Sequence, residues 1–352
     1  MSNWEQNVRR AVPYTPGEQP QESGVIKLNT NENPFPPSPS VKKILDDLDT
    51  DRLRLYPEPD CKTLITAIAE RYGVKESQVF VGVGSDDVLS MAFMTFFNSD
   101  KPILFPDVTY SFYDVWADVY KIPYKTCPLR GDFTIEPGDY KQPNGGIVFP
   151  NPNAPTGVCE SVEMIEDVVK ANPSSVVIID EAYVDFGGES CLPLIEKYDN
   201  LLVVQTFSKS RSMAGMRIGF AIGSERLIKY MNDVKFSVNS YTMNTLTLLC
   251  GKAAVQDEEY FQKCCSEIIS IREYSKEKLK ELGFELTDSK SNFLFAKHKT
   301  ARARDIFEAL KERNIYVRYW DKQRISDYLR ITVGTREQMD KLFCALKDIL
   351  KG

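Results

Sequence analysis

The sequence predicts an α/β protein in which a mostly parallel sheet is covered by helices on both faces and is followed by a smaller α+β domain. Three observations support this prediction. Short apolar runs alternate with helical segments between about residues 77 and 223, each run ends at a polar or turn cluster, and strand-like runs return after a helical stretch that begins near residue 240. Alternation of this kind is typical of a parallel sheet that is buried on both faces.

Composition narrows the functional class. The length of 352 residues favours two domains. The net charge of -6 comes from interspersed acids and bases, so neither nucleic acid nor an anionic membrane is an expected partner, and a small anionic ligand must be held by local arginines. No apolar run approaches the roughly 20 residues that span a bilayer, and residues 1–20 lack the apolar core of a signal peptide. We therefore expect a cytoplasmic protein.

Metal and redox chemistry are not expected. The eight cysteines include the adjacent pair Cys264-Cys265 but no C-x-x-C spacing, and His298 is the single histidine, so the chain has no zinc pattern. We expect reduced, mostly structural thiols and no metal site. His298 lies in the charged run Lys297-His298-Lys299, which favours a solvated loop over a catalytic role.

The chain divides into three predicted parts. Residues 1–28 form a polar arm with turn signals at Pro13 to Gly17, expected to pack on the small domain and on a partner subunit. Residues 29–240 form the large domain and residues 241–352 the small one. The segment Asn29 to Pro34 carries amide and hydroxyl side chains ahead of a proline-rich turn, so it is expected to be irregular and either to lie on the surface or to line a site.

The strands and helices are predicted in order from apolar runs and helix start signals. In the large domain we expect strands at 78–81, 103–105, 147–149, 176–179 and 201–204, and helices at 86–97 and 161–170. A glycine turn is expected at residues 82–85. A further strand is expected at 217–223, and its short connection to the preceding strand could make it antiparallel. The expected elements of the small domain are helices 242–255, 257–282 and 336–351 and strands 293–295, 315–317 and 329–331.

Polar groups at the ends of the predicted strands form the candidate site, because ligands of open α/β sheets bind at the carboxyl ends of the strands. These groups are Asp180, Tyr183, Asn153, Lys209 and Arg217. Pyridoxal phosphate needs an amine for its aldehyde, an acid beside its ring nitrogen, donors for its phenolate oxygen and an arginine for its phosphate. This cofactor explains the set better than a nicotinamide cofactor does, because Gly82-Val83-Gly84-Ser85 lacks the G-x-G-x-x-G pattern.

A second feature fits the same cofactor. Gly84, Ser85 and Asp86 lie where a glycine turn meets a predicted helix, and free N–H groups at such a helix start can bind a phosphate. A tight turn that binds nothing is an equal alternative for this segment taken alone.

Several motifs resemble the fold-type I, class II aminotransferases, which depend on pyridoxal phosphate. They are Asn153-Ala154-Pro155-Thr156-Gly157, Asp180-Glu181-Ala182-Tyr183, and Ser208-Lys209 with Arg217 eight residues beyond. Five further motifs resemble one branch of that family, which transaminates L-histidinol phosphate with 2-oxoglutarate. They are Pro13-Tyr14-x-Pro16-Gly17, Leu28-Asn29-x-Asn31-Glu32-Asn33-Pro34, Tyr56-Pro57, Gly84-Ser85-Asp86 and Arg330 to Thr335. The motifs run in register over nearly the whole chain.

The resemblance implies a role for each residue. Lys209 would bind the cofactor covalently and carry the proton during catalysis, Asp180 would keep the ring nitrogen protonated, and Tyr183 would donate to the phenolate oxygen. Tyr110 would stack on the ring face, with a position in the core as the alternative. The cofactor phosphate would be bound by Gly84, Ser85, Asp86, Ser208 and Arg217. Tyr56 would reach that phosphate from the partner subunit of a homodimer. Tyr14, Asn31, Arg318 and Arg330 would bind the substrates, although either arginine could instead form a surface ion pair.

One residue departs from the family pattern. The amide that bonds the phenolate oxygen normally directly precedes the proline, and this position is Ala154. Either Asn153 substitutes through a shifted loop or Tyr183 donates alone.

The implied reaction gives imidazole-acetol phosphate and L-glutamate, a step of histidine biosynthesis. Threonine-phosphate decarboxylase, an aromatic amino-acid aminotransferase, and a catalytically idle pyridoxal-phosphate-binding protein are the alternatives.

Overall fold

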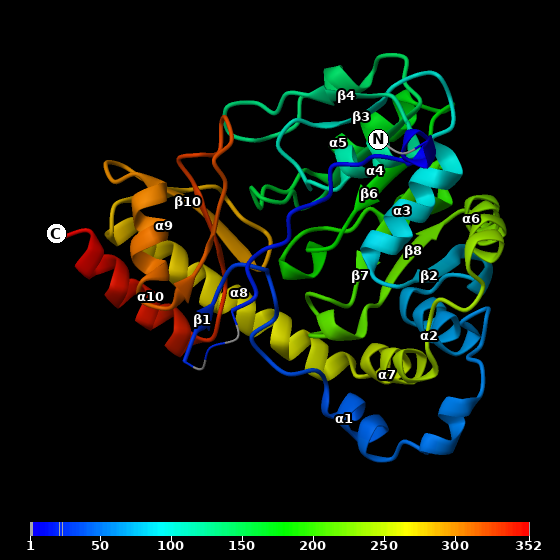
Figure 1. Cartoon of the computed structure of the whole chain (residues 1–352), viewed down its shortest axis with the longest axis horizontal. Coiled ribbons are helices and arrows are strands. Elements are labelled where there is room, and N and C mark those ends of the chain that lie inside the picture. Colours follow the sequence, from blue (N-terminus) through cyan, green and yellow to red (C-terminus); the bar gives the residue numbers. More distant parts are fainter. Residues whose placement is uncertain (1–2, 21, 23, 352) are drawn as a thin grey trace.

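The computed structural model describes residues 3–20, 22 and 24–351. Two units lie side by side, and Figure 1 shows the larger one mainly in blue through green to yellow-green and the smaller one mainly in orange and red. The long helix α8 (Glu258–Glu281), in yellow, runs from the larger unit into the smaller one.

The larger unit is built on a seven-stranded sheet with the order β2-β8-β7-β6-β5-β3-β4. Strand β8 runs antiparallel to both of its neighbours, and the other neighbouring pairs are parallel. This confirms the mostly parallel sheet and the antiparallel option for the strand expected at 217–223. The seven strands are β2 (Val79–Gly82), β3 (Ile103–Pro106), β4 (Tyr124–Cys127), β5 (Gly146–Pro150), β6 (Val177–Asp180), β7 (Leu201–Thr206) and β8 (Gly219–Gly223).

Helices bury both faces of this sheet, which explains why most of its strands read as continuous apolar runs. On one face, Phe80, Val148 and Leu202 pack against helices α3, α4 and α6. On the other face, Val81, Ile147 and Val203 pack against α2, α5 and α7, with α1 at the margin. The helix bounds are α1 (Pro39–Asp46), α2 (Lys62–Tyr72), α3 (Ser85–Phe96), α4 (Tyr113–Tyr120), α5 (Val162–Ala171), α6 (Glu225–Val238) and α7 (Thr245–Gln256).

The smaller unit has an antiparallel four-stranded sheet with the order β12-β13-β10-β9. Its core joins Leu294 and Ile331 of the sheet to Ile306 of α9 and Leu342 of α10. Its elements are β9 (Phe284–Leu286), β10 (Phe293–His298), α9 (Ala303–Lys311), β11 (Ile315–Tyr316), β12 (Arg318–Tyr319), β13 (Leu329–Thr332) and α10 (Arg336–Ile349).

The N-terminal segment crosses both units. Strand β1 (Ile26–Lys27) pairs in parallel with β11 of the smaller unit, and Leu28 is buried in that unit's core. Further back along the chain, Tyr14 stacks on Phe112 of the larger unit with 4.2 Å between the ring centroids. This path brings residues 29–33 to the boundary between the two units.

Helix α7 places the domain boundary later than residue 240. Its buried residues Leu248, Cys250 and Ala254 belong to the core beneath the large sheet. At the start of α8, Asp257 accepts a hydrogen bond from Ser38, and Glu258 pairs with Arg71 of α2 at 2.6 Å. We therefore propose that the second domain begins within α8.

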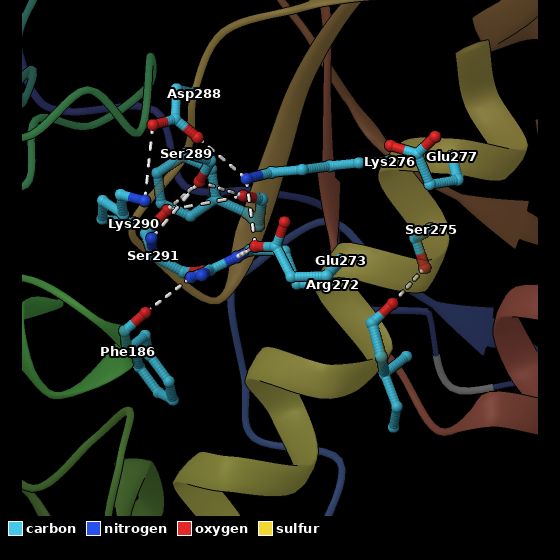
Figure 2. A network of polar contacts seen from close by, with 12 residues as sticks. Phe186, Arg272, Glu273, Ser275, Lys276, Glu277, Asp288, Ser289, Lys290 and Ser291 are labelled. Carbon is cyan, nitrogen blue, oxygen red and sulfur yellow. Dashed lines mark hydrogen bonds and ion pairs between the residues drawn. The ribbon is translucent and has the colours of Figure 1, made fainter.

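A polar network joins the two units in the middle of α8 (Figure 2). Arg272 is only 2% exposed, and its Nη1 donates to the Phe186 carbonyl oxygen of the larger unit at 2.6 Å and to the Ser291 carbonyl oxygen of the smaller unit at 2.9 Å. Glu273 balances the charge, with its Oε1 at 2.9 Å from Nε of Arg272 and at 3.0 Å from Nζ of Lys276. The network fixes the turn after Tyr183 against the strand that follows Ser291.

The position of His298 corrects the expectation of a solvated loop. His298 is half-buried at the end of β10, where its Nε2 lies 3.0 Å from the Leu282 carbonyl oxygen and its Nδ1 accepts a hydrogen bond from the Ala301 N–H at 2.9 Å. These contacts hold the strand end, and neither cavity described below is lined by this residue.

The described residues offer neither a metal cluster nor a membrane-spanning helix. No cluster of three or more histidine, cysteine or acidic side chains could hold a metal ion among them. None of their helices combines the length and apolarity needed to cross a bilayer.

Candidate active site

Two adjoining cavities open at the carboxyl ends of the parallel strands, between the two units. We call them the Asp180 cavity, of about 380 Å³, and the Arg330 cavity, of about 210 Å³. Both are lined by Lys209, Tyr110 and Tyr183, so they form one continuous site. The strand ends converge here because a parallel sheet brings its carboxyl ends to one edge.

Lys209 lies in the turn that follows β7, half-buried and at the junction of the two cavities. Its Nζ lies 3.3 Å from the Thr30 carbonyl oxygen, and the Asn33 amide donates to the Lys209 carbonyl oxygen at 2.9 Å. The next residue, Ser210, donates its hydroxyl to Asp185 at 2.5 Å. The lysine amine therefore faces an enclosed site on a backbone held from two sides.

Asp180 ends β6 and is only 4% exposed. Its Oδ2 accepts a hydrogen bond from the Tyr113 hydroxyl at 3.1 Å, and its Oδ1 accepts one from the Ala182 N–H at 3.2 Å. Burial raises the pKa of Asp180 to about 7 despite these two bonds, because they compensate only part of the lost hydration. A protonated base beside this carboxyl would offer the missing positive charge.

This raised pKa predicts a pH effect on the stability of the ligand-free protein. The folded chain keeps the Asp180 proton up to about pH 7, whereas the unfolded chain releases it near 3.8. The free energy of unfolding should therefore fall as the pH rises through this window, by at most about 4 kcal/mol from this group. We expect the free energy of unfolding to fall less between about pH 5 and about pH 8 in Asp180→Asn than in wild type, as measured by urea unfolding. An identical pH dependence in the two proteins would contradict the assignment.

Tyr183 presents its hydroxyl to both cavities. The Asn31 amide donates to that hydroxyl oxygen at 2.9 Å, and Asn31 is fixed in turn by Thr332, whose hydroxyl donates to the Asn31 Oδ1 at 3.1 Å. Because the phenolic oxygen already accepts from Asn31, its own hydrogen is left to donate toward the cavity. Asn31 thus orients the phenol. It also lines the Arg330 cavity, so the substrate contact expected from the sequence stays a prediction.

An anion cradle lies at the end of the Asp180 cavity, at the start of α3. Gly84 is the N-cap, with φ +86°, but its own N–H donates to the Gly82 carbonyl oxygen at 2.9 Å and it lines neither cavity, which does not fit the phosphate contact predicted for it. The first turn of α3 has no side-chain cap, and N–H groups at such a helix start can bind an anion. A Cβ at Gly84 would lie 2.5 Å from Nη2 of Arg217, which shows how closely the guanidinium approaches this turn. Ser85, Asp86, Ser208 and Arg217 all line the cavity, as the sequence predicted.

The Asp86 carboxylate organises two neighbours of this cradle. It accepts the Tyr110 hydroxyl at 2.7 Å and pairs with Nη2 of Arg217 at 3.2 Å. Tyr110 therefore lines both cavities with its hydroxyl anchored, and the core position considered as an alternative for it does not hold.

The Arg330 cavity contains a buried guanidinium without a carboxylate partner among the described residues. Nη2 of Arg330 donates to the Asn29 carbonyl oxygen at 2.9 Å, and Nε has no hydrogen-bond partner. Burial lowers the pKa of Arg330, and nearby Arg318 lowers it further. Both guanidinium groups contact the Trp320 ring, at 5.1 Å and 5.3 Å from its centroid. A doubly charged anion could pair with both guanidinium groups. Within the described part of the chain, neither arginine forms the surface ion pair considered for it.

Asn153 does not belong to the site. Its amide nitrogen donates to the Val108 carbonyl oxygen and to the Thr156 hydroxyl, both at 3.0 Å, and it lines neither cavity. Ala154 lines both cavities instead, and it carries no donor. The expectation that Asn153 substitutes through a shifted loop is therefore wrong, because its amide is used to hold the turn, and Tyr183 remains as the donor.

Tyr56 also lies outside both cavities of this single chain. It is 84% exposed, and its ring lies 4.8 Å from that of Tyr241. The predicted contact from a second subunit remains a prediction.

Three residues of the site were not anticipated: Tyr113 at Asp180, Trp320 between the arginines, and Thr206 in the wall of the Asp180 cavity. Asn33, which holds the Lys209 turn, belongs to the segment Asn29 to Pro34 that was expected to lie on the surface or line a site, whereas Trp320 lies in none of the motifs. Tyr113 has no such signal, because it is one of 17 tyrosines and is fully buried.

Comparisons with known proteins agree with this geometry. Residues 23–346 match the family described as aminotransferase class I and II. The chain is 52% identical over 349 residues to a histidinol-phosphate aminotransferase of Lactococcus lactis subsp. cremoris (strain MG1363), covering 99% of this chain and 98% of that protein. It is 53% identical over 348 residues to histidinol-phosphate aminotransferase 1 of Hydrogenovibrio crunogenus, again covering 99% and 98%.

A solved structure shares the fold. The histidinol-phosphate aminotransferase from Sinorhizobium meliloti in complex with pyridoxal-5'-phosphate matches with a TM-score of 0.85 and 22% identity, covering 93% of this chain and 91% of that one.

Proposed function

The chain belongs to the aminotransferase class I and II family, and on that premise we propose that it is a fold-type I enzyme that binds pyridoxal 5'-phosphate and transaminates L-histidinol phosphate with 2-oxoglutarate. The products are imidazole-acetol phosphate and L-glutamate, in a step of histidine biosynthesis. One observation carries the proposal: a half-buried lysine, a buried acid and an arginine with no carboxylate partner among the described residues line one continuous site. Relatives more than 50% identical bear the corresponding name.

The residues of the Asp180 cavity fit the cofactor. Pyridoxal 5'-phosphate supplies, when bound, an aldehyde that reacts with amines and a ring that withdraws electrons from the substrate's Cα. Asp180 would hold the proton on the ring nitrogen. Its carboxyl is bonded by the Tyr113 hydroxyl and the Ala182 N–H, and burial raises its pKa to about 7. Tyr183 would donate to the phenolate oxygen, while the start of α3, Ser208 and Arg217 would hold the phosphate.

Lys209 has two tasks in this scheme. Its Nζ would bind the cofactor's aldehyde and later, as a free amine, would move a proton to and from the substrate's Cα. A backbone gripped by Asn33 and by the Ser210–Asp185 contact suits both tasks, because proton transfer requires the amine to stay within hydrogen-bond reach of its target.

The Arg330 cavity would bind the acidic part of each substrate. Histidinol phosphate carries a phosphate and 2-oxoglutarate carries two carboxylates, so the same guanidinium groups serve both half-reactions of a ping-pong cycle. Arg330, Arg318 and Tyr14 all line this cavity, and Arg318 donates to the Thr15 carbonyl oxygen at 3.3 Å. The Arg318 contact ties the N-terminal arm to the substrate site.

A side-by-side substrate assay tests the reaction. The purified enzyme with added pyridoxal 5'-phosphate should convert 2-oxoglutarate to glutamate with histidinol phosphate as the amine donor. It should release no CO2 from threonine phosphate and should be much slower with phenylalanine or tyrosine. Carbon dioxide release from threonine phosphate would identify a decarboxylase, and a preference for the aromatic acids would identify an aromatic aminotransferase. A visible absorption band without turnover of any donor would identify an idle binding protein.

We further propose a homodimer in which Tyr56 reaches the cofactor phosphate of the partner subunit. Large apolar side chains gather on the surface near it, with Leu53, Leu55 and Tyr241 all more than 45% exposed. An exposed apolar patch of this kind marks an interaction surface. The eight free thiols suit a reducing compartment, so we place the dimer in the cytoplasm.

Tyr56→Phe tests this arrangement. The apolar patch is kept, so the variant should remain dimeric by size-exclusion chromatography. It should bind pyridoxal 5'-phosphate at least about tenfold more weakly, because one charge-assisted hydrogen bond is lost. Tyr230→Phe is the matched control, since Tyr230 is also an exposed tyrosine at 50%. A wild-type monomer with full cofactor affinity would refute the shared site.

A further inference from the structure

A short segment of the smaller unit closes one side of the Arg330 cavity. Residues 320–325, which we call the strap, follow β12 and contribute Trp320, Lys322, Gln323 and Ile325 to the cavity wall. None of the strap residues lines the Asp180 cavity among the residues described. The strap therefore shapes the proposed substrate space without touching the proposed cofactor space.

Arg324 fastens the strap to the larger unit. Its Nη1 forms an ion pair with Asp107, and its Nη2 donates to the carbonyl oxygens of Leu129 at 2.7 Å and Arg130 at 3.0 Å. Asp107 is itself held, because its Oδ1 accepts the Leu129 N–H at 2.9 Å and its own N–H donates to the Cys127 carbonyl oxygen at 2.9 Å. One side chain thus reaches three acceptors that lie on a rigid strand end.

The backbone of Arg324 indicates that these contacts hold the strap in place. Its φ is +72°, in the left-handed region that is unfavourable for a residue with a Cβ. Such a conformation persists where surrounding contacts over-determine it. The contacts here are those of the Arg324 guanidinium, the burial of Ile325 in the core beneath the large sheet, and the hydrogen bond from the Ile325 N–H to the Lys322 carbonyl oxygen at 3.2 Å.

The strap also carries the aromatic ring that both substrate-side arginines contact. The Trp320 centroid lies 5.1 Å from the Arg330 guanidinium carbon and 5.3 Å from that of Arg318. Moving the strap would move this ring and release the two guanidinium groups from their present spacing. A dianion held by both groups depends on that spacing.

We propose that Arg324 is a positioning residue for substrate binding: by docking the strap on Asp107 and the 129–130 backbone, it sets the spacing of Arg318 and Arg330 around Trp320. This inference rests on the proposed function for the identity of the anions. The docking itself is a property of the chain and can be measured without substrate.

The kinetic experiment uses Arg324→Met in the holoenzyme, with histidinol phosphate and 2-oxoglutarate as substrates. We expect KM for both substrates to rise about tenfold, with kcat at saturation close to wild type. The pH titration of the visible band of the lysine-bound cofactor should not move, because the strap does not reach the Asp180 cavity. Asp107→Asn should raise KM in the same direction, and the double variant should be no worse than Arg324→Met alone.

Arg130→Met is the matched control. It removes an exposed arginine that pairs with Glu136 at 2.6 Å, while the Arg130 carbonyl oxygen that Arg324 uses remains. Its KM values should equal those of wild type.

Limited trypsin digestion of the holoenzyme measures directly whether the strap is docked on the larger unit. Cleavage after Lys322 should be about tenfold faster in Arg324→Met than in wild type or Arg130→Met, because an undocked strap opens locally. Unchanged KM together with unchanged cleavage would overturn the inference, as would a shift of the cofactor titration equal to the KM effect. Failure of wild type to transaminate histidinol phosphate would refute the proposed function, whereas the cleavage comparison would still decide the docking.

Discussion

Lys209→Ala is expected to lower kcat by at least about 10⁴-fold, the largest effect of any substitution in this chain. The change removes both the amine that would bind the cofactor and the base that would move the Cα proton. Lys209 lines both cavities, and its Nζ lies 5.9 Å from the centroid of the Tyr183 ring. Absorbance spectra of the purified variant should lack the visible band that arises when this lysine binds pyridoxal 5'-phosphate.

Two further measurements make this test specific. Lys209→Arg keeps the positive charge but is not a nucleophile at neutral pH, so it should be as inactive as the alanine variant. Added methylamine should restore part of the activity of Lys209→Ala, because it supplies a small base to the vacated space. An alanine variant with a wild-type spectrum and rate would show that the reactive amine lies elsewhere.

Arg330→Met is expected to lower kcat/KM for both acidic substrates by about 10²–10³-fold while leaving the fold intact. The loss follows from removing a buried guanidinium whose Nε has no partner in the ligand-free chain. The free energy of unfolding should stay unchanged or rise by about 1 kcal/mol, because burial already disfavours the charged form. Activity and stability should therefore move in opposite directions, as at other functional sites.

Steady-state kinetics and urea unfolding of the same preparations test this prediction. Arg330→Lys should fall between wild type and the methionine variant in kcat/KM, because it keeps the charge but loses the planar pair of donors. A methionine variant that is strongly destabilised would mean that Arg330 mainly supports the fold through its bond to the Asn29 carbonyl oxygen.

Much of the large sheet could be predicted because its central strands are buried on both faces. Val177 to Ile179 and Leu201 to Val204 are continuous apolar runs in the sequence for this reason. Strand β4 was missed, since three of its four residues are exposed at the sheet edge and the run is not apolar. The early boundary near residue 240 reflects helix α7, whose composition resembles that of the helices after it although it packs beneath the large sheet.

The positions of the candidate catalytic residues were predictable, because a group that follows a buried parallel strand must emerge at one edge of the sheet. This holds for Asp180 after β6 and for Lys209 after β7. The same argument gave a wrong prediction for Asn153. The direction of its side chain depends on a loop in which its amide bonds to the Val108 carbonyl oxygen. Trp320 and Arg324 could not be found, since their roles arise only when the smaller unit meets the larger one.

Helix α8 has a practical consequence for anyone who wishes to divide or rebuild this protein. The connection between the units is a continuous helix of 24 residues that is anchored to α2 at its start and to both units at Arg272. Tolerated cut and insertion points are exposed loop tips, and this helix offers none between its two anchors. Each added residue would turn everything beyond it by about 100° and advance it by about 1.5 Å. The smaller unit is therefore tied to the larger one at a fixed distance and rotation, and we expect that the two cannot be exchanged as separate modules.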